Sequence, residues 1–68
     1  MDMRKLVGRN VLAARSALDI TQEQLAERSG FSQQYISGLE RGQRNPTIVS
    51  LFEVAMALET TPINLLLP

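Results

Sequence analysis

Two helix starts of the same design stand close together in the sequence, with a single glycine between them. Thr21 is followed three residues later by Gln24, the spacing of a capping box, in which each side chain accepts a hydrogen bond from the other residue's backbone N–H. Ser32 is a second N-cap of the same kind. Gly30 lies where the first helix ends, because glycine adopts the left-handed conformation of a helix C-terminus without steric cost. Residues 21–41 are therefore predicted to form two short helices joined by a tight turn.

Apolar residues surround both caps at the spacing of a hydrophobic staple. Ile20 precedes the first cap, and Leu25 stands at the fourth position of the helix that follows. Phe31 and Ile36 have the same positions around the second cap. Ala26 is small where the two helices should approach each other most closely. The pair is therefore expected to share one apolar side.

The remainder of the chain is also predicted to be helical. Apolar residues recur at helical spacing over residues 4–17 and just beyond. The expected buried stripe of this first helix consists of Val7, Val11, Ala14 and Leu18. Thr47 caps a later helix that runs to about Leu58, and Pro62 opens a short last helix. We therefore expect residues 1–68 to form a single all-α domain, a compact bundle of about five short helices in which helices two and three form the pair described above.

The chain contains no cysteine and no histidine, so it lacks the usual zinc ligands and cannot form a disulfide. Its hydroxyl groups also lack an imidazole base, and there is no glycine-rich phosphate loop. We expect no catalytic site, no metal and no cofactor. No apolar run is long enough to cross a membrane, and no signal peptide is recognisable at the N-terminus. The protein is expected to be cytoplasmic, without membrane contact.

The formal net charge of zero argues against a strongly basic nucleic-acid-binding protein. The charges are unevenly distributed, however. The first 44 residues carry seven basic and five acidic side chains, a net charge of +2, whereas the rest carries only Glu53 and Glu59, a net charge of −2. Small domains also show such asymmetry by chance, so the charge alone does not indicate a partner.

The helix pair and the segment after it resemble the lambda-repressor-like helix-turn-helix family, the Cro/repressor or XRE group of bacterial and phage regulators. The matching residues are Thr21, Gln22, Leu25, Ala26, Gly30, Ser32, Tyr35, Ile36, Ser37, Glu40, Arg41, Gly42, Arg44, Asn45, Pro46, Leu51, Val54 and Ala55. The similarity extends over roughly residues 6–67, nearly the whole chain. The resemblance implies a helix-turn-helix whose second helix enters the major groove of double-stranded DNA.

The resemblance also implies that the first turn of this recognition helix faces the DNA bases. Gln33 and Gln34 occupy that turn, and a glutamine can form a bidentate pair with N6 and N7 of adenine. Ser37 lies four residues after Gln33 on the same face and is a third candidate for a base contact. The alternative is that the two glutamines are only solvated helix formers. These three residues are the predicted base contacts.

Gly38 stands where relatives often carry a longer side chain that faces the groove. A glycine inside a helix costs about 1 kcal/mol relative to alanine, so its presence needs a reason. Either it lets the backbone approach the DNA, or it relieves crowding against the following loop. The sequence leaves both explanations open.

Other residues around the recognition helix are predicted to hold the DNA phosphates, which fixes the register without reading the sequence. They are Gln22, Ser32, Tyr35, Arg41, Arg44, Asn45 and Thr47. For the two arginines the alternative is a solvated surface charge, and for Tyr35 it is partial packing.

Arg15 and Glu40 match a pair that in relatives joins the first helix to the recognition helix, so the resemblance implies a structural ion pair.

Four apolar residues near the C-terminus are predicted to form a dimer interface. Phe52 and Met56 are an i, i+4 pair beside the buried stripe of the fourth helix, and Ile63 and Leu67 are a second such pair. The alternative is that these residues complete the protein's own core. Glu59 replaces the glycine that commonly ends the fourth helix in relatives, which leaves the geometry of that turn open.

The resemblance thus implies a sequence-specific transcriptional regulator that binds a pseudo-palindromic operator as a homodimer. The alternative function is a protein-interaction module, such as the antitoxin of a toxin–antitoxin pair. Such a module would neutralise its partner through the apolar C-terminal region.

Overall fold

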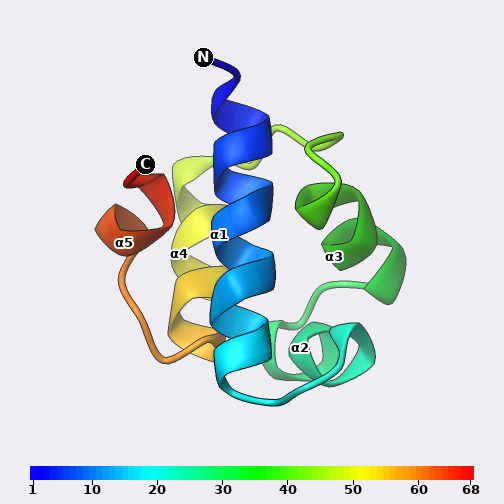
Figure 1. Cartoon of the computed structure of the whole chain (residues 1–68). Coiled ribbons are helices and arrows are strands. Elements are labelled where there is room, and N and C mark those ends of the chain that lie inside the picture. Colours follow the sequence, from blue (N-terminus) through cyan, green and yellow to red (C-terminus); the bar gives the residue numbers. More distant parts are fainter.

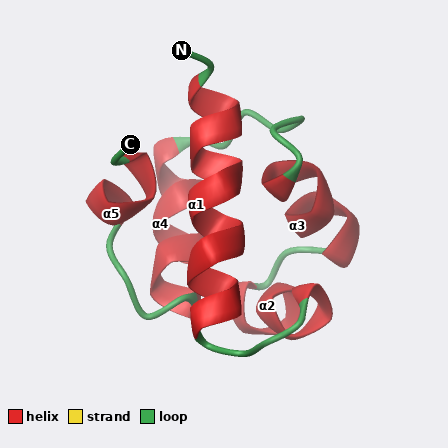
Figure 2. Ribbon diagram, in the orientation of Figure 1, coloured by secondary structure: helices red, strands yellow, loops and turns green.

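The computed structural model describes residues 1–68 and consists of helices joined by short loops (Figure 1). It contains five helices, which are α1 (Met3–Ala17), α2 (Gln22–Ser29), α3 (Gln33–Glu40), α4 (Ile48–Ala57) and α5 (Pro62–Leu66). Figure 2 shows that no strand interrupts them. The molecule measures 29 × 20 × 20 Å. The all-α bundle expected from the sequence is confirmed.

Every helix begins at a polar residue whose side chain caps it. The Thr21 hydroxyl accepts a hydrogen bond from the Gln24 N–H at 3.0 Å, and the Gln24 side-chain oxygen accepts one from the Thr21 N–H at 2.8 Å. The predicted capping box is therefore complete. The caps of α3, α4 and α5 are Ser32, Thr47 and Thr61. Helix α1 begins slightly before its predicted start, because Asp2 caps it by accepting a hydrogen bond from the Arg4 N–H.

The helices enclose one core of 12 buried residues. Leu25, Ile36 and Leu39 of the α2–α3 pair are fully buried in it, together with Val54 of α4 and Leu65 of α5. Burial of a large aliphatic side chain contributes about 1.5–3 kcal/mol. Helices α2 and α3 are thus stabilised mainly by this shared core, since helices of eight residues are too short to persist alone.

The buried side of α1 is broader at its N-terminal end than the predicted stripe. Val7 and Val11 are buried as expected, and Leu6 is buried as well, although the stripe did not include it. Ala14 and Leu18 are only partly buried. The reason is that α1 is covered by two elements, α3 on one side and α5 on the other (Figure 1).

Gly8 lets α1 approach the C-terminal end of α3. A Cβ atom at this position would lie 2.4 Å from the carbonyl oxygen of Leu39 and 2.7 Å from that of Glu40. Because backbone atoms rather than flexible side chains occupy this space, any other residue would push the two helices apart. No local pattern in the sequence indicates this role of Gly8.

We expect Gly8→Ala to destabilise the protein by about 1–3 kcal/mol in urea unfolding, because overpacking outweighs the gain in helix propensity. The matched control is Ala13→Gly at an exposed position of the same helix, which measures propensity alone and should cost about 1 kcal/mol. If Gly8→Ala stabilised the protein, the close approach of α1 and α3 described here would be wrong.

Asn10 fastens α5 to α1. Its side-chain amide donates hydrogen bonds to the carbonyl oxygens of Leu65 at 2.9 Å and Leu67 at 2.7 Å, at the C-terminal end of α5. These carbonyls have no partner inside the helix, so the amide supplies the bonds that the helix end lacks. The short α5 is therefore held in place by this amide and by the buried Leu65.

The turn between α4 and α5 contains a residue in the left-handed conformation, although this residue is Glu59 and not the glycine common in relatives. Glu59 has φ +59°, and the Thr60 N–H that follows it donates to the Ala55 carbonyl at 2.9 Å. The left-handed conformation costs a residue with a Cβ atom roughly 1–2 kcal/mol. The Glu59 carboxylate lies 3.7 Å from the Arg28 guanidinium, but both side chains are exposed, so the pair stabilises little.

We expect Glu59→Gly to stabilise the protein by about 0.5–1 kcal/mol in urea unfolding, since relief of the backbone strain exceeds the entropy that glycine adds to the unfolded chain. Glu59→Ala is the control, because it removes the carboxylate and keeps the strain. It should change the free energy of unfolding by less than about 0.5 kcal/mol. Equal effects of the two substitutions would show that the carboxylate, and not the backbone, determines the result.

Candidate nucleic-acid interface

Helices α2 and α3 and the turn between them form a compact unit on one side of α1 (Figure 1). Gly30 ends α2 with φ +81°, and its N–H donates to the Ala26 carbonyl at 3.0 Å. This is the left-handed turn that the sequence predicted. Helix α3 contacts both α1 and α2, so its buried side is fixed by two neighbours.

The N-terminal turn of α3 is exposed, whereas its C-terminal part is buried. Gln33 and Gln34 are exposed, while Ser37 is only half-buried on the same helix. Ile36 and Leu39 point into the core. The two glutamine amides are therefore accessible to an external partner, and Ser37 is less so.

The Arg44 side chain lies along α3 and covers Gly38. A Cβ atom at Gly38 would lie 3.1 Å from Arg44 Nε and 3.2 Å from its Cγ. The Gln43 N–H also donates to the Gly38 carbonyl at 2.9 Å, which ties the loop to the helix. Of the two explanations for this glycine, relief of crowding against the loop agrees with the structure. The buried Gly38 does not offer its backbone to a partner.

Two aromatic rings support the Arg44 side chain. Its guanidinium carbon lies 5.4 Å from the centre of the Tyr35 ring, within the range of a cation–π interaction. Tyr35 stacks in turn on Phe31, with ring centres 4.7 Å apart. Tyr35 is half-buried, as the packing alternative for this residue anticipated. The stacking holds Arg44 close to α3 while the side chain as a whole stays exposed.

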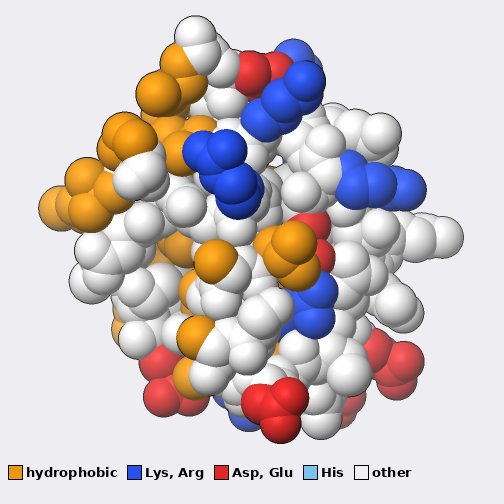
Figure 3. All heavy atoms as spheres, viewed as in Figure 1, with side chains coloured by type: hydrophobic (Ala, Val, Ile, Leu, Met, Phe, Trp, Pro, Cys, Tyr) orange, Lys and Arg blue, Asp and Glu red, His pale blue; other side chains and the backbone are white.

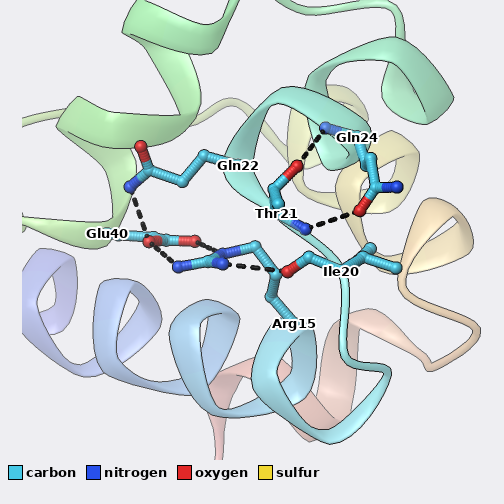
Figure 4. A network of polar contacts seen from close by, with 6 residues as sticks. All are labelled: Arg15, Ile20, Thr21, Gln22, Gln24 and Glu40. Atoms are coloured by element: carbon cyan, nitrogen blue, oxygen red, sulfur yellow. Dashed lines mark hydrogen bonds and ion pairs between the residues drawn. The ribbon is translucent and has the colours of Figure 1, made fainter.

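A polar network joins α1, α2 and α3 (Figure 4). Arg15 Nε donates to Glu40 Oε2 at 2.6 Å, Arg15 Nη2 donates to Glu40 Oε1 at 3.0 Å, and Arg15 Nη1 donates to the Ile20 carbonyl at 2.9 Å. The Arg15 and Glu40 side chains are 16% and 4% exposed. The structure therefore brings together the two residues that the resemblance paired.

The hydrogen bonds that Arg15 donates to Glu40 raise the pKa of Arg15 above its ordinary value. Burial opposes this rise, and the attraction of the carboxylate adds to it. Because the pKa is raised, Arg15 contributes this stabilisation around neutral pH and loses it as the pH rises into the strongly alkaline range. Arg15 thus stays charged around neutral pH.

Gln22 is part of the same network, a contact that was not predicted from the sequence. Its Nε2 donates to Glu40 Oε1 at 2.9 Å, and the side chain is half-buried. It was predicted to hold a phosphate, but its amide is already partly engaged inside the protein. The two residues are 18 positions apart, so no local pattern in the sequence indicates this bond.

The predicted phosphate contacts differ in how free their polar groups are. Arg41 and Asn45 are exposed in the segment after α3. The Ser32 hydroxyl accepts from the Tyr35 N–H at 3.1 Å and keeps its own O–H free to donate. The Thr47 hydroxyl is more restricted, since it accepts from the Ser50 N–H and donates to the Ser50 hydroxyl, both at 3.0 Å. Thr47 is thus primarily a helix cap.

The surface charges separate along the molecule. Figure 3 shows most Lys and Arg side chains toward the end that holds the N-terminus, and most Asp and Glu side chains at the opposite end. Arg41 and Arg44, which follow α3, belong to the basic group of residues before position 45. Although the net charge is zero, the basic and acidic side chains are concentrated at different ends of the molecule. The basic end therefore favours contact with an anion.

The predicted dimer residues lie on the surface and do not complete the core. Phe52 and Met56 on α4 are 48% and 55% exposed, and Ile63 and Leu67 near the C-terminus are 68% and 52% exposed. Leu66 and Met3 are also exposed, and Figure 3 shows apolar side chains gathered over α5 and the first turns of α1. We call the four predicted residues the C-terminal apolar surface.

The fold and the arrangement of α2, the Gly30 turn and α3 define a helix-turn-helix protein. The profile of the helix-turn-helix family HTH_3 matches residues 11–65. The chain is 54% identical over 68 residues to the HTH-type transcriptional regulator y4dJ of Sinorhizobium fredii, itself uncharacterized, and the match covers 100% of this chain and 88% of that protein. It is 41% identical over 66 residues to the control protein C.SmaI of Serratia marcescens, over 97% of this chain and 79% of that protein.

A solved structure gives the same result. The restriction-modification controller protein C.AhdI of Aeromonas hydrophila superposes with a TM-score of 0.88 at 37% identity, covering 91% of this chain and 94% of that one. The chain therefore belongs to the HTH_3 helix-turn-helix family, whose members are DNA-binding transcriptional regulators and not enzymes. None of its helices has the length and apolar character that crossing a membrane requires.

Proposed function

We propose that this regulator binds a specific DNA sequence by placing the N-terminal turn of α3 in the major groove. The observation that carries the proposal is the exposure of Gln33 and Gln34 at the free end of a helix whose other end is buried. A glutamine amide can pair with adenine at two atoms, and a rigid support makes such pairing selective. Ser37 would reach a base only at close approach.

The groups around α3 fit a clamp on the DNA backbone. Arg44 is held along the helix by Gly38 and Tyr35, so it loses little side-chain entropy when it meets a phosphate. Arg41 and Asn45 are exposed in the same segment after α3. The N-termini of α2 and α4 add backbone N–H groups with a partial positive charge, which attract anions. Gln22, Ser32 and Thr47 lie at or beside the starts of helices α2, α3 and α4.

A homodimer would double the small number of DNA contacts that one copy makes. Two symmetric copies place two recognition helices in successive major grooves, roughly 34–36 Å apart, on a pseudo-palindromic operator. The C-terminal apolar surface supports this arrangement, because exposed Phe, Met, Ile and Leu side chains are stabilised by burial against a second copy. The relatives described above are named as regulators and control proteins, so regulation of transcription is favoured over an antitoxin role.

Selection of bound duplexes from a random-sequence pool tests the proposal. We expect enrichment of one sequence with two inverted half-sites whose centres are about 10–10.5 base pairs apart, or a multiple of this spacing. Binding should weaken as salt concentration rises, because phosphate contacts release counterions. A pool that stays random after repeated rounds would overturn the proposed function.

The two kinds of contact should respond differently to substitution. On the selected duplex, we expect Gln33→Ala to cost about 1–3 kcal/mol and to relax the preference at one position. Arg44→Gln should instead weaken binding to selected and random duplexes alike and reduce the slope of log K against log salt by about 1. Fluorescence anisotropy at several salt concentrations measures both effects.

Arg28→Gln is the matched control, since it removes the same charge at the far end of α2. It should leave the salt slope nearly unchanged. If Gln33→Ala weakened binding to random DNA as much as to the selected duplex, Gln33 would not read bases.

The C-terminal apolar surface is tested by charge substitution. We expect Phe52→Asp to shift the protein from dimer to monomer in sedimentation equilibrium, because a buried unpaired carboxylate is costly in an interface. The fold should persist, since Phe52 is half exposed in the monomer. Leu12→Asp, at an apolar position on α1 that is 42% exposed, should leave the dimer intact. A dimer that survives Phe52→Asp and dissociates with Leu12→Asp would place the interface elsewhere.

A further inference from the structure

Glu40 fixes the orientation of the Gln22 side-chain amide. A carboxylate only accepts hydrogen bonds, so the amide must turn its nitrogen, and not its oxygen, toward Glu40. Glu40 itself has little freedom, because its side chain is 4% exposed and Arg15 binds both of its oxygens. In Figure 4 the Gln22 oxygen points away from the carboxylate. The amide of Gln22 is therefore held in one of its two possible orientations.

Gln22 is also the first residue of α2, where the helix turns its free N–H groups outward. Its Nε2 carries two hydrogens, and Glu40 accepts only one of them. The second hydrogen remains available. A DNA phosphate near this helix end only accepts hydrogen bonds, so it needs an N–H in a defined place.

Arg15 makes a carboxylate acceptable at this position. An unpaired Glu40 would repel the phosphates of a DNA backbone, whereas the guanidinium neutralises it through two hydrogen bonds. Glu40 therefore keeps its hydrogen bond with Gln22, while the charge of Arg15 cancels the long-range repulsion between Glu40 and the phosphates. The three residues form a chain that runs from α1 through α3 to the start of α2.

We propose that Glu40, supported by Arg15, is a positioning residue that orients the Gln22 amide so that its second N–H meets a DNA phosphate. This inference rests on the proposed function and adds a role for the ion pair beyond joining helices. It makes an unusual electrostatic claim: removal of a negative charge from a DNA-binding protein weakens its binding. From net charge alone, removing a negative charge from the protein should strengthen its binding to DNA.

A double-substitution cycle tests the proposal on the duplex selected from the random pool. Wild type, Glu40→Gln, Gln22→Ala and the double variant are compared by fluorescence anisotropy at one salt concentration. We expect Glu40→Gln to weaken binding about tenfold, the effect of one well-placed hydrogen bond. In the Gln22→Ala background the same change should have an effect below about twofold, because the residue that Glu40 orients is gone.

An equal loss in both backgrounds would overturn the proposal, since Glu40 would then act on α3 or on the fold as a whole. Glu23→Gln is the matched control, because it removes an exposed carboxylate next to Gln22 on the same helix. We expect the control to bind DNA as tightly as wild type, or more tightly. If Glu23→Gln weakened binding as much as Glu40→Gln, the effect would not be specific to the bond with Gln22.

A measurement without DNA keeps the proposal testable if Glu40→Gln lowers stability. The side-chain amide of Gln22 gives its own signals in a nitrogen–proton correlation spectrum. We expect these signals to move in Glu40→Gln and to stay in place in Glu23→Gln at a temperature where urea unfolding shows both variants folded. Unmoved Gln22 signals in Glu40→Gln would overturn the positioning role. A wild-type protein with no preference for the selected duplex would instead overturn the proposed function, and the role of Glu40 in DNA binding with it.

Discussion

The ion pair between Arg15 and Glu40 is the interaction on which the arrangement of this molecule depends. It joins α1 to the end of α3, and the same carboxylate binds Gln22 at the start of α2. A buried ion pair is weak evidence for stability, because desolvation offsets much of its attraction, but it is directional. Gly8 brings the backbone of α1 against the same end of α3. Together they determine where α3 lies, and the hydrophobic core then stabilises that placement.

This anchoring divides α3 into two parts with different properties. The C-terminal part is packed against α1 and covered by Arg44, which lies over Gly38. The N-terminal turn, with Gln33 and Gln34, is free on the surface. Because the packed part of α3 holds the backbone of this turn, binding orders only the side chains of the turn and not its backbone. Arg44, which follows α3, lies over the Tyr35 ring close to this turn, although the chain as a whole is neutral.

The sequence predicted the parts of the fold that depend on local chemistry. Thr21, Ser32 and Thr47 cap their helices as expected, and the turn at Gly30 is left-handed, because caps and turns are specified by neighbouring residues. Contacts between distant segments were less accessible. The role of Gly8 depends on where the carbonyl groups of α3 lie. The hydrogen bonds of Asn10 depend on the position of the end of α5, and the bond between Gln22 and Glu40 depends on the angle between α2 and α3. For Gly38, two explanations remained until the position of Arg44 separated them. The DNA contacts and the dimer remain predictions.

We propose that the free turn of α3 and the helix starts beside it form the DNA-binding face. Backbone amide signals recorded during titration with the selected duplex test it most directly. We expect the largest changes in residues 21–24, 32–35 and 41–48, with small changes in residues 26–29 at the far end of α2. Changes confined to α4 and α5, with the α3 amides unmoved, would contradict it.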